Sequence, residues 1–164
     1  MRVLLKLELD CDPDAAWAAL RSPAVFREVS GPLMRFESLD VGGFTETWTE
    51  GEHRVAARLL GLVPAGTQLI DIRTEQRTDH RHGRHEAPTQ VRIVHDTGRG
   101  LSFPLTLTTG WHHRMAVSAL PDGRTLYRDE LRFSAGLLSP AAWLAYWAFW
   151  QLRGLAIARL SARW

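Results

Sequence analysis

A chain of 164 residues has the length of one typical domain and is long enough to bury a sizeable core. Its 45% apolar and 23% charged residues are ordinary for a globular protein and exclude a disordered or fibrous chain. The formal net charge is only +2, and the basic residues are scattered among the acidic ones without a concentrated stripe, so nucleic-acid binding is not expected.

The N-terminal residues alternate between apolar and polar side chains, which predicts a first strand with one buried face over residues 3–9. The segment quickly acquires charges and is unlike a signal peptide, so we expect a cytoplasmic location. Cys11 is the single cysteine, which excludes an internal disulfide or a multi-cysteine metal site.

Three sites share the same helix-start pattern, in which a side-chain oxygen can cap free backbone N–H groups and proline supplies the first helical φ. They are Asp12-Pro13, Ser22-Pro23 and Ser139-Pro140. The first two predict short helices over 13–20 and 23–29. The third predicts a long helix from about residue 140 to the C-terminus.

Everything between the second and third helices has the pattern of strands. The expected segments are 33–39, 44–50, 53–60, 68–77, 90–96, 110–120 and 124–134. Pro121-Asp122-Gly123 predicts a hairpin turn between the last two. Strands in unbroken succession favour an antiparallel meander, so the prediction is a single α+β domain over residues 1–164: a curved sheet of about six or seven strands with the long C-terminal helix packed across one face.

With this element order, the chain resembles the helix-grip fold of the START/Bet v 1-like (SRPBCC) superfamily, which includes polyketide cyclases and lipid-binding domains. The resemblance covers essentially the whole chain. It rests on the order of elements and on three local phrases: Asp12-Pro13-Asp14-Ala15-Ala16-Trp17, Trp111-His112-His113-Arg114-Met115 and Tyr127-Arg128-Asp129-Glu130-Leu131. The resemblance implies a cavity for a hydrophobic ligand between the sheet and the long helix. It implies no reaction.

The C-terminal helix is apolar nearly all round as far as Leu152. Trp143, Trp147, Trp150 and Gly154 follow helical spacing on one face, where they either pack in the core or line a ligand cavity. Arg153 ends the apolar run after roughly a dozen residues, too few for the about 20 that span a bilayer. Peripheral docking of this tryptophan- and arginine-rich end on a membrane surface stays open.

Polar side chains interrupt the strand faces that are expected to turn inward, and their orientation depends on strand register. The residues are Glu46, His95, His113, Tyr127 and Asp129. Because 110–120 and 124–134 are adjacent, Asp129 can orient His113 as a general acid/base. The same contact can equally be a structural hydrogen bond. We expect His112 and Arg114 to face outward.

The loop from Asp79 to Glu86 contains three histidines, but its interleaved arginines repel a cation, so we predict no metal site. Cys11 lies among acidic residues that raise a thiol pKa and is a poor nucleophile. The sequence contains no nucleotide or cofactor fingerprint, and we predict no cofactor.

Three hypotheses remain. The first is a module that binds a hydrophobic or aromatic small molecule, lipid- or polyketide-like, in a cavity under the helix. The second is a polyketide cyclase or dehydratase that uses His113 and Asp129, and the third is a domain without a ligand. The sequence does not predict an oligomeric state. The residues expected to contact the ligand are Trp48, His95, Trp111, Met115, Tyr127, Trp143, Trp147, Trp150 and Gly154.

Overall fold

The computed structural model describes residues 1–79 and 89–164. Its elements follow in chain order, with short 3-10 turns at Leu105–Leu107 and Gly136–Leu138. They are β1 (Arg2–Leu9), α1 (Pro13–Leu20), α2 (Pro23–Ser30), β2 (Met34–Ser38), β3 (Gly51–Leu59), β4 (Val63–Asp79), β5 (Thr89–Asp96), β6 (Arg99–Gly100), β7 (Thr109–Ala119), β8 (Thr125–Ser134) and α3 (Ser139–Ser161).

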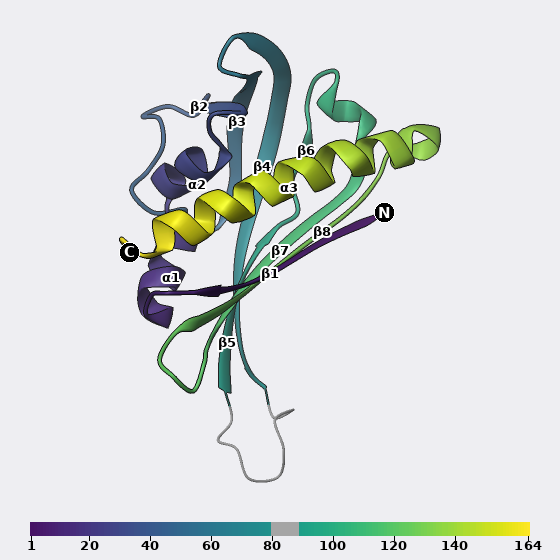
Figure 1. The fold of residues 1–164 in the computed structure, drawn as a ribbon. Coiled ribbons are helices and arrows are strands. Elements are labelled where there is room, and N and C mark those ends of the chain that lie inside the picture. Colours follow the sequence, from purple (N-terminus) through teal and green to yellow (C-terminus); the bar gives the residue numbers. More distant parts are fainter. Residues whose placement is uncertain (80–88) are drawn as a thin grey trace.

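The described strands form one eight-stranded antiparallel sheet in the order β1-β8-β7-β5-β4-β3-β2, and β6 pairs with β4. This is more than the six or seven expected, because β6 has two residues and shows no periodicity. The hairpin predicted at 121–123 joins β7 and β8, and Gly123 adopts the positive φ that this turn needs. β1 pairs with β8, so the first and last strands lie side by side (Figure 1).

The prediction of a strand at 44–50 is wrong. This segment is an irregular connection between β2 and β3. Trp48 is nevertheless buried, because its indole packs against Phe26 and Phe44 and its backbone N–H donates to the carbonyl of Arg21. Glu46, expected to face the helix, is exposed to solvent.

Two of the three predicted helix caps are confirmed. Asp12 accepts from the N–H of Asp14, and Ser22 accepts from the N–H of Val25. The third is wrong: Ser139 is already the first residue of α3, and its Oγ accepts from the backbone N–H of Ala135 in the preceding turn. A 3-10 turn leads directly into α3 and takes the place of an extended cap residue.

Helix α3 crosses one face of the sheet and packs against β1 and α2 (Figure 1). Trp150, Gly154 and Ile157 on its inner side are buried. Its outer side is less covered than the apolar sequence predicts, because Leu144 and Leu155 are 60% and 65% exposed. None of the described helices combines the length and apolar character that crossing a bilayer requires.

Candidate functional site

A cavity of about 350 Å³ lies between α3, α2 and the sheet. Its walls are largely apolar: β2 contributes Phe36, β4 contributes Ile70 and Ile72, and Phe26 and Phe149 close it from α2 and α3. Cavities of about 300–1,000 Å³ with apolar walls and a few polar groups are typical sites for small molecules.

Four of the aromatic and sulfur-containing residues expected at the ligand line this cavity. Trp111 and Met115 enter it from β7, Trp150 enters from α3, and Trp48 enters from the connection before β3. His113 also lines it, between Trp111 and Met115 on the same face of β7. The alternating pattern of β7 therefore predicted correctly that Trp111, His113 and Met115 share its inner face.

Trp143 and Trp147 do not line the cavity. Their indoles stack on each other with centroids 6.4 Å apart, and Trp143 Nε1 donates to the carbonyl of Arg2. Trp147 is 43% exposed. Trp143 lies two turns before Trp150 along α3 and packs beside the cluster of Val3, Leu131 and Phe133, so of these three helix indoles Trp150 is the one that lines the cavity.

Gly154 is buried but also lies outside the cavity wall. A Cβ at this position would lie 2.9 Å from Leu5 Cδ2 and 3.1 Å from Leu5 Cδ1. The missing side chain therefore allows close contact between α3 and β1. It does not widen the cavity.

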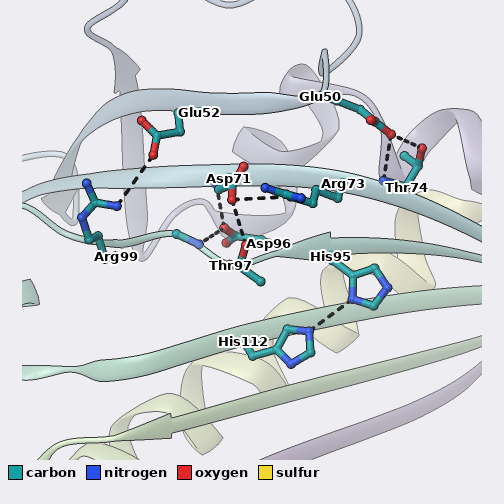
Figure 2. Close-up of polar contacts among 11 residues, drawn as sticks. Glu50, Glu52, Asp71, Arg73, Thr74, His95, Asp96, Thr97, Arg99 and His112 are labelled. Carbon is teal, nitrogen blue, oxygen red and sulfur yellow. Dashed lines mark hydrogen bonds and ion pairs between the residues drawn. The ribbon is translucent and has the colours of Figure 1, made fainter.

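The inward orientation expected of His95 is wrong. His95 lies on the outer face of the sheet, where its Nδ1 is 3.2 Å from His112 Nε2 and its Nε2 is 2.9 Å from Glu75 Oε2. Figure 2 shows the two imidazoles directed at each other across neighbouring strands. His112 and Arg114 also face outward, as expected, and line a groove on this face together with His95. The hydrogen bond from His95 is the main cause that lowers the pKa of Glu75.

Asp129 is the centre of a buried hydrogen-bond network behind the cavity wall. Its Oδ1 accepts from His113 Nε2 at 2.8 Å and from Trp150 Nε1 at 2.9 Å. Its Oδ2 accepts from the Tyr127 hydroxyl at 2.6 Å and lies 3.9 Å from Arg153 Nε. Tyr127 is fully buried and supports this network without lining the cavity.

The electrostatics of this network keep Asp129 ionised. Burial alone raises its pKa, but the charge and hydrogen bond of His113, the charge of Arg153 and the Tyr127 hydroxyl together lower the pKa to about 2. An ionised carboxylate is only an acceptor, so the nitrogen of His113 that faces it must carry the proton. Asp129 thus fixes the tautomer and the ring orientation of His113.

Asp96 is a cavity residue that the sequence pattern did not reveal. It ends β5, pairs in register with His113 and lines the cavity. The Trp111 indole donates to its Oδ2, and the N–H groups of Asp71 and Gly98 donate to its Oδ1; Figure 2 includes the contact with the backbone of Asp71. Burial is the largest effect on this carboxyl and raises its pKa.

Gly98 makes the position of Asp96 attainable. A Cβ on Gly98 would lie 1.8 Å from the carbonyl oxygen of Leu69, which no side chain could tolerate. The chain therefore runs close against β4 directly after β5, and the Gly98 N–H reaches Asp96. The glycine was visible in the sequence, but only the strand pairing gives it this role.

Arg153 is the second cavity residue that sequence reasoning missed. In the sequence it only marked the end of an apolar run. In the structure its side chain is 6% exposed and lines the cavity from α3. Helical spacing places it three residues after Trp150, on the same inner side of the helix.

Together these residues surround one end of β7 with groups that can hold or move a proton. His113 borders the cavity, Asp129 orients it from behind, and Asp96 lies opposite it in the pairing of β5 with β7.

Among the described residues no cluster of His, Cys, Asp and Glu is arranged to hold a metal. The histidines of the loop 80–86 lie outside the described residues. Burial, with the nearby Asp12 and Asp10, raises the pKa of the Cys11 thiol.

No family model and no curated protein matches the chain. Its fold does occur among solved structures. A Chromobacterium violaceum protein superposes with a TM-score of 0.60 at 13% identity, over 98% of this chain and 96% of its own. A Nitrosospira multiformis protein gives 0.56 at 12% identity over 98% and 95%, and a hypothetical Helicobacter pylori protein gives 0.56 at 11% over 98% and 88%. Likeness at such identities shows a shared fold and does not extend to a ligand or a reaction.

Proposed function

We propose that the protein binds a hydrophobic or aromatic small molecule, lipid- or polyketide-like, between the sheet and α3, in the manner of the START-like helix-grip domains that its sequence resembles. The observation that carries this proposal is the cavity of about 350 Å³ with largely apolar walls and a few polar groups, among them Asp96, His113 and Arg153. A void of that size is far larger than one or two water molecules need, which weighs against a domain without a ligand.

The driving force for such binding is the removal of apolar surface from water, about 25 cal/mol for each Å² buried. The aromatic walls also offer ring contacts to an aromatic ligand. Trp48, Trp111 and Trp150 border the cavity, so their fluorescence reports its occupancy.

The test is a thermal-shift and tryptophan-fluorescence titration of the purified chain with decan-1-ol, decanoate and 2-naphthol. A ligand present at one hundred times its Kd stabilises the folded state by about 2.7 kcal/mol. For a chain of this length that corresponds to a rise in Tm of about 5–10 °C. If none of the three compounds changed Tm or fluorescence at solubility-limited concentration, the proposal would be wrong.

A second candidate function is acid–base catalysis on a bound polyketide-like ligand, and the contact between His113 and Asp129 at the cavity wall favours it. A histidine whose tautomer is fixed can take a proton from carbon between two carbonyl groups and return it. The probe is hydrogen–deuterium exchange of benzoylacetone, followed by NMR. If the protein is a catalyst, it makes the exchange faster than in buffer. This acceleration should be lost in His113→Ala and kept in His112→Ala, which changes the outer face. Exchange that survives His113→Ala would exclude this role.

A further inference from the structure

Arg153 places a permanent positive charge at the wall of the cavity. Its side chain is 6% exposed and reaches the cavity from the inner side of α3. A guanidinium does not lose its proton in a protein, so this charge cannot be removed by titration. A buried charge destabilises the folded state unless acceptors surround it.

The acceptors around Arg153 are few, and one of them, the Tyr127 hydroxyl, already donates to Asp129. Its Nη2 donates to the Sδ atom of Met115 at 3.3 Å, and a thioether is a weak acceptor. Its Nε is buried and has no hydrogen-bond partner among the described residues. The nearest carboxylate oxygen, Asp129 Oδ2, is 3.9 Å from Nε, beyond hydrogen-bond distance.

Asp129 does not compensate for this shortage, because its oxygens already have other donors. His113 and Trp150 donate to Oδ1, and Tyr127 donates to Oδ2. Its negative charge is therefore shared with three shorter contacts. Arg153 is left with more donors than the protein satisfies, beside an apolar cavity.

We infer that the ligand of this cavity is a small amphipathic acid, whose apolar body fills the cavity and whose carboxylate binds the guanidinium of Arg153. This inference rests on the proposed function and specifies the class of ligand. A carboxylate is the acceptor that fits a guanidinium best, because two parallel N–H···O bonds can form at once. Asp96 on the same wall already accepts from Trp111 and from the backbone N–H groups of Asp71 and Gly98, whereas Arg153 keeps free donors for a ligand.

The first test compares three compounds with the same chain length on the unmodified protein: decanoate, decan-1-ol and decylammonium. Decanoate is expected to bind about tenfold or more tightly than decan-1-ol, as charge-assisted hydrogen bonds are about twice as strong as neutral ones. Decylammonium is expected to bind most weakly, because its charge repeats that of Arg153. Isothermal titration calorimetry measures the three constants.

The second test uses Arg153→Met, which keeps an unbranched side chain and removes the guanidinium with its charge. Its affinity for decanoate should fall about tenfold or more, while its affinity for decan-1-ol stays within about threefold. Arg159→Met, at an exposed position of the same helix, is the matched control and should change neither affinity. Arg153→Lys keeps the charge and should retain part of the preference for decanoate.

The outcomes separate this inference from the proposal on which it rests. If decanoate and decan-1-ol bind equally well, or only the alcohol binds, the cavity stands and the role of Arg153 is wrong. If neither binds, the amphipathic acid is the wrong ligand class, and if 2-naphthol also fails to bind, the cavity itself is not a ligand site. The comparison on the unmodified protein keeps its meaning even if Arg153→Met does not fold.

Discussion

The two faces of the sheet each hold a histidine beside a carboxylate, and the two pairs differ mainly in burial. On the α3 side, His113 lies 2.8 Å from Asp129, with side chains 7% and 0% exposed. On the outer face, His95 lies 2.9 Å from Glu75, with side chains 20% and 47% exposed. Water screens the outer pair and not the inner one, so contacts of equal length have unequal consequences for stability and chemistry.

The largest expected effect comes from removing the charge of the inner pair. Asp129→Asn leaves Arg153 without its nearest carboxylate and places an amide N–H₂ among groups that all donate. Breaking a buried pair in this way costs about 3–5 kcal/mol. Urea denaturation should show this loss. Glu75→Gln is the outer-face control and should stay within about 0.5 kcal/mol of the parent, so equal losses would refute the contrast between the faces.

The next effect is a pH dependence of opposite sign at the two buried carboxyls. Asp129 has a folded pKa of about 2 against an ordinary 3.8. Because the pKa of Asp129 is lower in the folded than in the unfolded protein, this group adds about 2 kcal/mol to the free energy of unfolding. The contribution is fully present above the unfolded pKa and is lost as the pH falls through 2. Burial raises the pKa of Asp96 above 3.8, so stability from this group falls as the pH rises above that value.

Denaturation curves between pH 2 and pH 7 measure both contributions. Asp129→Asn should flatten the rise between pH 2 and 4, and Asp96→Asn should remove the decline above pH 4. A slope above pH 4 that is unchanged in Asp96→Asn would show that this carboxyl does not have a raised pKa in the folded protein.

A smaller effect distinguishes the cavity from the tight packing on the other face. Ile70 lines the cavity, whereas Ile93 is fully buried with Val91 and Ala116 on the outer face. Ile93→Phe should cost about 1–3 kcal/mol because that cluster has no room. Ile70→Phe should cost less, because its ring can enter the cavity, and should weaken binding of decan-1-ol. Equal stability losses, with binding unchanged in Ile70→Phe, would contradict a cavity at Ile70.

The smallest effect is expected at Gly154. Alanine improves helix propensity by about 1 kcal/mol, but its Cβ must displace the end of the Leu5 side chain. These effects nearly cancel, so Gly154→Ala should change the free energy of unfolding by less than about 1 kcal/mol. Decan-1-ol affinity should not change, because Gly154 lies outside the cavity wall. A severalfold loss of affinity would show that Gly154 is part of the binding site.

The sequence predicted most elements because their signals are local. Proline after a capping residue marked α1 and α2, and the turn at 121–123 set the β7–β8 hairpin, in which Asp129 pairs with Met115, the next residue after His113 on the inner face of β7. The contact of Asp129 with His113 therefore followed from one turn and one alternation.

The inner face of β5 could not be read in the same way. Val91, Ile93 and Val94 are all at most 1% exposed, so apolar residues mark both faces and the alternation no longer tells His95 from Asp96. Arg153 was missed for another reason. A charge in an apolar helix is typical of the surface, and helical spacing alone does not show that this one is buried beside Asp129.

The tryptophan side chains offer the most direct test of a ligand cavity under α3. The measurement is a titration of ¹⁵N-labelled protein with decan-1-ol, in which NMR follows the indole N–H resonances. Trp48, Trp111 and Trp150 line the cavity and should shift with saturation, while Trp143 and Trp147 should stay in place. Shifts confined to Trp143 and Trp147, or no shift at any indole, would contradict binding between the sheet and the helix.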